Sequence, residues 1–259
     1  MIQQQCYTRA ARGLFRPSAG YDTVAKSAGL TEEFIKERLH PFCYYNALTT
    51  GECPKVLTVI QFPEGLTMIG RTVHVERDFT GERATFFTHN YVMPRQLGVF
   101  DAEFLSETED AELPELDELP LTEGQGKALP FETERLQQLA GAVTDAVAGT
   151  RKVYVVIPEG DYLTESVIEW LYRNLPTETA EELGFTTYSR EPLNKKFLHL
   201  IFVERDSMTY KDKVVERDYF VDLENGYFKL PKVESGTVVK RGSEKKKGFF
   251  EKIFRFFKG

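Results

Sequence analysis

The first hundred residues have mostly the pattern of β-strands and turns, and one stretch alternates between apolar and polar positions with the period of a half-buried strand. Val73 and Val75, for example, flank the polar residue His74. Segments rich in aromatic and β-branched residues are separated by turn residues at positions 63–65 and 80–82. This pattern predicts a β-rich N-terminal domain over residues 1–98, with strands at residues 3–9, 56–62, 71–79 and 84–92.

One helix is expected within this region, and it begins after Thr31. Thr31 is a good N-cap, and Glu32 and Glu33 suit the positive end of the helix dipole. His40 precedes Pro41, and a residue before proline is displaced from helical backbone angles. We therefore expect the helix to end at His40.

After residue 128 the pattern changes to alternating helices and strands. A short helix starts at Pro176, and Gly184 is placed to close it as a left-handed C-cap. Residues 128–205 are expected to form a small α/β domain, which makes the whole chain an α+β protein. The other predicted helices are residues 134–147 and 164–175, and the strands are residues 152–157, 185–189 and 196–204.

An acidic segment separates these two regions. Residues 96–126 contain no Lys, Arg or His but ten Asp or Glu, together with Pro114 and Pro120. Such a composition opposes regular structure, so residues 99–127 are predicted to be a linker whose apolar residues lie partly on a domain surface. Residues 206–242 are expected to form a charged extension.

Composition and charge narrow the function classes. A net charge of −7 over 259 residues argues against nucleic acid as a partner, since proteins that bind it carry a basic face. Three cysteines without metal-type spacing and the absence of a secretory signal predict a cytoplasmic protein. The histidines are scattered and no phosphate-binding glycine motif is present, so we expect no metal, no cofactor and no nucleotide hydrolysis.

A cysteine-nucleophile hydrolase is the alternative enzymatic hypothesis. Cys6 or Cys43 would supply the thiolate and His89 the base, with Asn90 beside it as the orienting residue. His89 and Asn90 are neighbours in a predicted strand, however, so their side chains are expected to point to opposite faces. Buried structural cysteines and a hydrogen-bonded core histidine are the favoured interpretation.

Four long blocks in the first third of the chain carry a family resemblance. They are QQQCYTRAARGLF (3–15), GYDTVAKSAGL (20–30), LHPFCYY (39–45) and DFTGERATFFTHNYVMP (78–94). In this order they resemble the signature of the GTPase-associated protein 1 family, N-terminal domain type 2. The stretch LPTETAEELGFTTYSREP (175–192) is similar, more loosely, to the domain that follows in that family.

The resemblance implies a non-catalytic adaptor encoded beside a small GTPase and a membrane or effector component in prokaryotic conflict systems, which are thought to act against phage or other invaders. Family members are longer, so this chain is expected to be a short version. No catalytic residues are carried over. For each matched position a structural role is the alternative to recognition. The candidates for partner binding are Tyr7, Arg9, Tyr21, Asp22, Lys26, His40, Phe79, Thr80, Arg83, His89 and Asn90.

The last residues form a basic, phenylalanine-rich segment. On a helix, the apolar residues of positions 249–257 occupy one arc of about 160° and the charged residues the other side. Eight Lys or Arg and two Glu between residues 240 and 258 give a local charge of +6. This pattern predicts an amphipathic helix over residues 243–259 that binds an anionic membrane surface or a membrane protein.

Docking of this segment on the protein's own body, or in the groove of a partner, is the alternative. Under the favoured interpretation the protein associates peripherally with the inner face of the membrane. The residues predicted to contact the membrane are Lys245, Lys246, Lys247, Phe249, Phe250, Lys252, Ile253, Phe254, Arg255, Phe256, Phe257 and Lys258.

Overall fold

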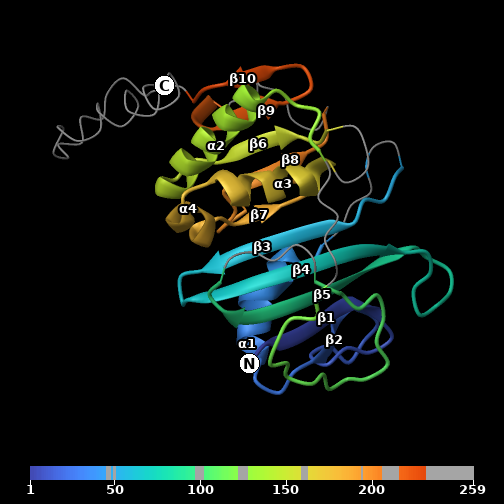
Figure 1. Ribbon diagram of the computed structural model, residues 1–259. Helices are drawn as coiled ribbons and strands as arrows, with labels where there is room; N and C mark the ends of the chain where they lie inside the picture. Colours follow the sequence, from blue (N-terminus) through green and yellow to red (C-terminus); the bar gives the residue numbers. More distant parts are fainter. Residues whose placement is uncertain are drawn as a thin grey trace.

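A computed structural model (Figure 1) describes residues 1–44, 48, 51–96, 102–121, 128–158, 163–193, 195–205 and 216–231. These residues form a ten-stranded mixed sheet with helices on both faces, which confirms the α+β class. The strand order is β10-β9-β6-β8-β7-β3-β4-β5-β1-β2. The strands are β1 (Gln3–Ala10), β2 (Gly20–Lys26), β3 (Val56–Phe62), β4 (Leu66–Val75), β5 (Thr85–Pro94), β6 (Val153–Val156), β7 (Phe185–Thr186), β8 (Leu200–Val203), β9 (Tyr219–Asp222) and β10 (Tyr227–Lys229).

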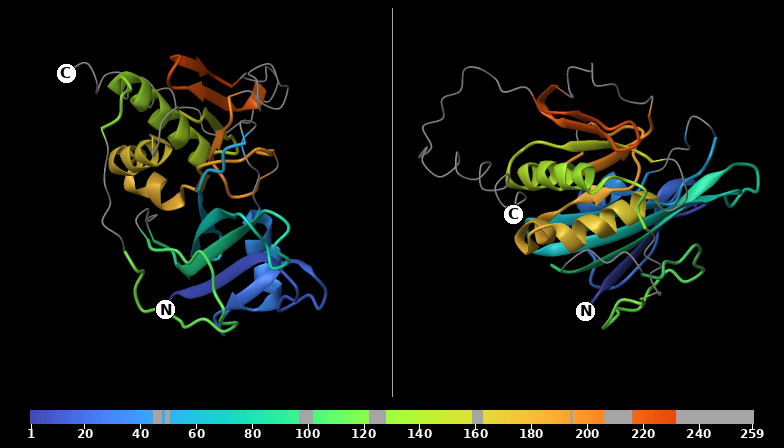
Figure 2. Two further views of the ribbon diagram at one scale, coloured as in Figure 1. Left: turned by 90° about the vertical axis from the view of Figure 1, so that its right-hand side faces the viewer. Right: turned by 45° about the horizontal axis from the view of Figure 1, so that its top comes forward.

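The helices lie on opposite faces of the two halves of the sheet (Figures 1 and 2). Three helices cover one face of the half that contains β6, and we call this side of the sheet the helical face. A shorter helical segment packs on the opposite face, against β3, β4 and β5. The helices are α1 (Glu32–Phe34), η1 (Ile35–Leu39), η2 (His40–Phe42), α2 (Thr133–Ala148), α3 (Leu163–Asn174) and α4 (Thr177–Glu182).

The two halves of the sheet meet at the short strand β7. It pairs antiparallel with β3, with Thr58 opposite Thr186 and Val59 opposite Phe185, and parallel with β8. The hydroxyls of Thr58 and Thr186 are 2.9 Å apart. The buried cluster on the helical face therefore runs without interruption from β3 and β4 to α2, α3 and α4. Residues of both predicted domains therefore contribute to the same sheet and to this buried cluster.

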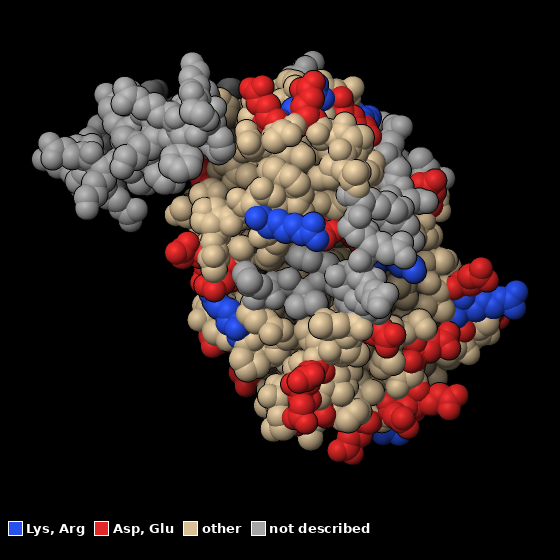
Figure 3. All heavy atoms as spheres, in the orientation of Figure 1, with Lys and Arg blue, Asp and Glu red and all other residues tan. Residues whose placement is uncertain are grey.

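Residues 102–121, which were predicted to belong to a linker, lie against the N-terminal half. Backbone bridges join Leu116 to Ile2 and Glu112 to Lys26, and Leu113 is buried. Phe104 packs on the core of the helical face. The acidic side chains of this segment are mostly exposed, and Figure 3 shows Asp and Glu side chains gathered over the lower part of the molecule.

Part of the predicted charged extension also belongs to the sheet. All four residues of β9 are buried, and β9 pairs parallel with β6. Strand β10 continues from it as the partner in an antiparallel hairpin. Because the apolar patch at residues 219–223 is short and surrounded by charges, its role as a strand depends on this pairing with β6.

The helical segment begins after Thr31 as predicted, and Thr31 Oγ1 accepts a hydrogen bond from the Phe34 amide at 3.2 Å. It does not end at His40. A 3-10 turn, η2, continues through Pro41, and the Cys43 amide donates to the His40 carbonyl at 3.0 Å. Proline is tolerated there because the first positions of a helical turn need no N–H partner.

The prediction for Gly184 was wrong. Helix α4 ends with Leu183 in an extended conformation, and Gly184 is not among the described glycines with positive φ. The glycine instead permits a close approach of two backbones. A Cβ atom at Gly184 would lie 1.9 Å from the carbonyl oxygen of Phe197, and the Gly184 amide donates to His199 Nδ1 at 3.1 Å.

Gly184→Ala is therefore expected to lower the free energy of unfolding by about 3 kcal/mol, since the methyl group meets backbone that cannot rotate away. Urea unfolding measures the effect. Gly141→Ala is the control, because Gly141 lies in α2 with no atom within 4 Å of the added Cβ. That change is expected to raise stability by up to about 1 kcal/mol. Equal stability of the two variants would contradict the close approach.

Among the helices formed by the described residues, none is long and apolar enough to cross a bilayer. The predicted amphipathic helix at residues 243–259 lies outside the described residues.

Candidate functional site

Three aromatic side chains stack on the sheet face opposite the helical face. The Tyr21 and Phe86 rings lie 4.7 Å apart and the Tyr7 and Tyr21 rings 6.1 Å apart, both nearly parallel. Tyr7 also contacts the His40 ring at 4.8 Å. We call Tyr7, Tyr21 and Phe86, together with Arg9 and Phe79, the aromatic cluster.

Strand pairing brings these residues together. Arg9 on β1 lies opposite Tyr21 on β2, and Tyr7 lies opposite Thr88 on β5, two positions from Phe86. Alternate residues of a strand share a face, so the two β1 residues point to the same side. The register of β1 and β2 shifts between Cys6 and Tyr7.

Arg9 joins the cluster to the loop after β4. Its guanidinium forms an ion pair with Asp78 and lies 5.2 Å from the centre of the Phe79 ring. The Thr80 amide donates to Asp78 Oδ1 at 2.9 Å. The Thr80 hydroxyl and amide, and then Arg9, lower the pKa of Asp78. Asp78 therefore pairs with Arg9.

A network of hydrogen-bonded polar side chains adjoins the cluster at His40, whose ring contacts Tyr7. His40 Nε2 lies 2.9 Å from Thr23 Oγ1, which accepts a hydrogen bond from Gln5 Nε2 at 2.9 Å. Asn90 Nδ2 donates to Gln5 Oε1 at 2.7 Å and to Cys43 Sγ at 3.2 Å. Burial lowers the pKa of His40, which favours its neutral form. These bonds hold β1, β2, β5 and the helical segment in one arrangement.

The outer part of the aromatic cluster is accessible. The side chains of Tyr21 and Phe79 are exposed to 38% and 46%, although each is a large apolar group. Exposed aromatic rings beside an arginine are the composition found at the centre of protein interfaces. The arrangement is therefore suited to protein contact.

The other predicted partner-binding residues lie in different settings. Asp22 is buried, and its Oδ2 accepts a hydrogen bond from the Phe15 amide at 2.8 Å, which is a structural role. Lys26 ends β2, and its backbone bonds to residues 111 and 113. Arg83 is exposed on the loop that carries Phe79.

His89 and Asn90 are buried and point to opposite sides of β5, as predicted. His89 Nε2 lies 3.0 Å from Gln4 Oε1, and His89 Nδ1 accepts the Leu105 amide at 3.0 Å. Both ring nitrogens are thus engaged, and the ring fastens the acidic segment to the sheet.

The two candidate nucleophiles are buried structural cysteines. Burial raises the pKa of both the Cys6 and the Cys43 thiol to about 12. Cys6 lies directly opposite His89 in the strand register, but His89 is bonded to Gln4 and to the Leu105 amide. A thiol reacts as its thiolate, so this geometry does not favour nucleophilic chemistry. Within the described part of the chain, no group of His, Cys, Asp and Glu is arranged to hold a metal ion.

The state of His89 predicts a pH dependence of stability. Burial lowers its pKa to about 4 in the folded protein, against an ordinary value of 6.5. Between these two pKa values the unfolded chain therefore binds more protons than the folded protein. The free energy of unfolding falls as the pH falls through this range. The parent is expected to lose free energy of unfolding when the pH is lowered from about 7 to about 5. In His89→Gln this loss should be smaller by about 2 kcal/mol.

Urea unfolding at the two pH values checks this expectation. His74→Gln is the control, because His74 is an exposed histidine on β4. An unchanged pH dependence in His89→Gln would show that His89 is not held neutral.

Sequence reasoning missed Phe86 and Phe15 as neighbours of the candidate residues. Phe86 stacks on Tyr21, and Phe15 lies 6.5 Å from the His40 ring. The signal for Phe86 was its even spacing from Thr88 and Asn90 in β5, which places all three on one face.

Two family models match the chain. The model described as GTPase-associated protein 1, N-terminal domain type 2, matches residues 1–121, and the model described as GTPase-associated protein 1, middle domain, matches residues 123–225. The chain belongs to the GTPase-associated protein 1 family. A comparison with curated proteins found no match.

Membership in the GTPase-associated protein 1 family gives the chain a GTPase-associated role. The match to the N-terminal domain includes the acidic segment of residues 102–121, in agreement with its packing on β1 and β2. The match to the middle domain includes β9. Both family domains therefore contribute strands to the same sheet.

Proposed function

We propose that this GTPase-associated protein is a non-catalytic adaptor that binds a partner GTPase, or the effector of the same system, through the aromatic cluster. The observation that carries the proposal is the pair of exposed aromatic rings of Tyr21 and Phe79, the first stacked on Tyr7 and the second beside Arg9, on a chain of the GTPase-associated protein 1 family.

The physics of interfaces supports this choice of surface. Tyrosine and arginine are enriched among the residues that dominate the binding energy of protein interfaces, and tyrosine buries a large area at a small cost in conformational entropy. The cluster is also held rigidly, since the Arg9–Asp78 ion pair and the polar chain from His40 to Cys43 fix its base. A rigid surface loses little entropy on binding.

The setting of this adaptor in a prokaryotic conflict system, acting against phage, is part of the same proposal and is supported by the family resemblance. Attachment to the inner face of the membrane is supported by the basic, phenylalanine-rich sequence of residues 243–259. In this arrangement the folded body recognises the partner and the C-terminal segment keeps both near the bilayer.

Pull-down with the GTPase encoded beside this protein tests the proposal. The full chain is immobilised, and the GTPase is offered in its GDP-bound and GTP-bound forms and the effector of the same system separately, with a GTPase from an unrelated system as the control. We expect retention of the neighbouring GTPase in at least one nucleotide state. Failure in both states, with the effector also not retained, would contradict the adaptor role.

A further inference from the structure

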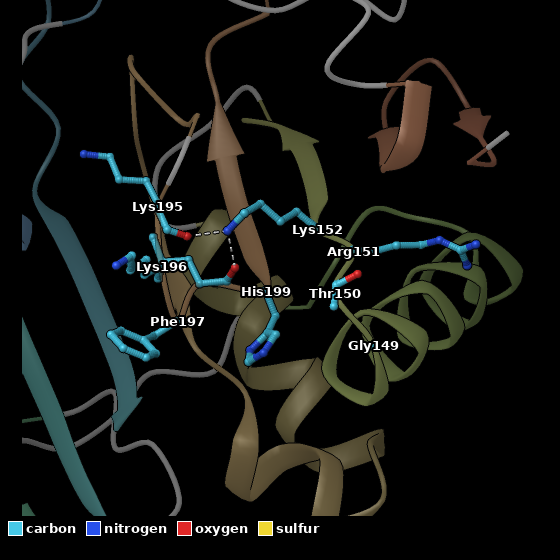
Figure 4. Close-up of a pocket in the computed structure, with 9 residues that line it drawn as sticks. Gly149, Thr150, Arg151, Lys152, Lys195, Lys196, Phe197 and His199 are labelled. Carbon is cyan, nitrogen blue, oxygen red and sulfur yellow. Dashed lines mark hydrogen bonds between the residues drawn. The ribbon is translucent and has the colours of Figure 1, made fainter. Parts of the chain in front are cut away.

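A cavity of about 390 Å³ lies at the edge of the sheet where the parallel strands begin. It is bounded by residues 149–152, which lead into β6, and by residues 195–199, which lead into β8 (Figure 4). Its volume falls within the range of small-molecule sites, roughly 300 to 1,000 Å³. The cavity belongs to the middle domain and shares no residue with the aromatic cluster.

The lining of this cavity is basic, although the chain as a whole is acidic. Four Lys or Arg and one His contribute to it. Two of the cations are committed elsewhere. Arg151 points away toward α2 (Figure 4) and pairs with Asp145 at 2.8 Å, and the Lys195 ammonium lies 3.8 Å from the centre of the Tyr44 ring.

Lys152 lies across the cavity (Figure 4). Its ammonium donates to the carbonyl of Leu198 at 2.8 Å and to the carbonyl of Lys195. An ammonium has three donors, so one N–H is left for a ligand. Burial lowers the pKa of Lys152, while the nearby Asp218, which accepts the Lys152 amide at 2.8 Å, acts in the opposite direction.

His199 supplies a second donor of defined direction. Its Nδ1 accepts the amide of Gly184 at 3.1 Å, so the neutral ring carries its proton on Nε2. Burial, with a contribution from Lys152, lowers the pKa of His199 to about 4, which keeps the ring neutral at physiological pH. Within the part of the chain that the structure describes, Nε2 has no hydrogen-bond partner.

Lys196 adds an exposed cation at the rim, without an ion pair among the described residues. We propose that this cavity binds a small phosphorylated ligand, whose phosphate oxygens accept hydrogen bonds from Lys152 and His199 and pair with the ammonium of Lys196. A phosphate group suits the site because its several acceptor oxygens can meet donors that approach from two different loops.

Isothermal titration calorimetry of the full chain with inorganic pyrophosphate tests the proposal. GDP and a soluble inositol polyphosphate are titrated as well, because they carry phosphate groups on other molecular scaffolds. Lys196→Gln is expected to weaken pyrophosphate binding about tenfold, because a charge-assisted contact is lost. Lys196→Arg keeps the charge and is expected to restore most of the affinity. Lys196 is exposed, so both variants should unfold thermally as the parent does.

The C-terminal lysines could also attract phosphate, so a variant with Gln at Lys245, Lys246 and Lys247 is titrated beside the others. A tenfold loss in Lys196→Gln with little change in this tail variant supports the cavity. Equal affinities in Lys196→Gln and the parent, or no heat of binding at millimolar pyrophosphate, would overturn the proposal. None of these outcomes depends on whether the aromatic cluster binds a GTPase.

Discussion

Tyr21→Ala is expected to weaken binding of the partner GTPase at least about 30-fold, equivalent to roughly 2 kcal/mol, the usual threshold for a central interface residue. Tyr21 is exposed and yet stacked on both Tyr7 and Phe86, so it presents a large ring in a fixed position. Its hydroxyl accepts a hydrogen bond from Thr85 at 3.1 Å, which further limits its motion. Surface plasmon resonance with the immobilised GTPase measures the change.

The chain offers a matched control for this prediction. Tyr227 on β10 has the same exposure as Tyr21, 38%, but lies at the opposite edge of the sheet. Tyr227→Ala should leave the affinity within about twofold, as surface changes outside an interface do. Phe79→Ala removes an exposed ring of the cluster itself and should weaken GTPase binding as Tyr21→Ala does. Equal losses for Tyr21→Ala and Tyr227→Ala would remove the aromatic cluster from the interface.

Elements with a strong local signal were predictable from the sequence. Strand β3 coincides with the predicted residues 56–62, because a continuous apolar and β-branched run of that length fits a fully buried strand. Helices α2 and α3 differ from their predicted bounds by one residue at each end, since their apolar faces repeat with the helical period. Strand β2 was not predicted, because its residues alternate weakly and its position depends on β1.

Features that depend on distant pairing could not be predicted from local patterns. The joint between the two halves of the sheet rests on β7, two residues long, and on a hydroxyl pair between residues 128 positions apart. The acidic segment has the composition of a linker. Its few apolar residues, such as Leu113, pack beside Cys6 and Phe87. The apolar residues of the segment follow neither the helical nor the strand period, so the sequence does not predict that contact.

The candidate residues divide for a similar reason. Tyr7, Arg9, Tyr21 and Phe79 gather at an exposed end of the sheet, whereas His89 and Asn90 are enclosed. Both faces of β5 are covered at these two positions, one by the acidic segment and the other by Cys43, which directly follows the helical segment. A polar residue in a strand therefore indicates partner recognition only when it is known that no other segment of the protein covers its side of the sheet.

The second large effect concerns membrane binding by the basic, phenylalanine-rich segment of residues 243–259. Replacing Phe250, Phe254 and Phe257 by serine in the full chain is expected to weaken binding to vesicles about 50-fold or more. Complete burial of one such side chain contributes roughly 1.5 to 3 kcal/mol, so half-burial of three contributes a few kcal/mol. Flotation of the protein with liposomes of anionic and of zwitterionic lipid measures the partition.

A variant with Gln at Lys245, Lys246 and Lys247 separates the two contributions to that binding. Each basic residue near an anionic leaflet contributes about 1 kcal/mol, and salt screens the effect. The Gln variant should therefore lose affinity for anionic vesicles only, and less so at high salt, whereas the serine variant should lose affinity for both kinds. Unchanged flotation of the serine variant would mean that the phenylalanines bind the protein's own body or a partner, because their apolar area would then be buried away from lipid.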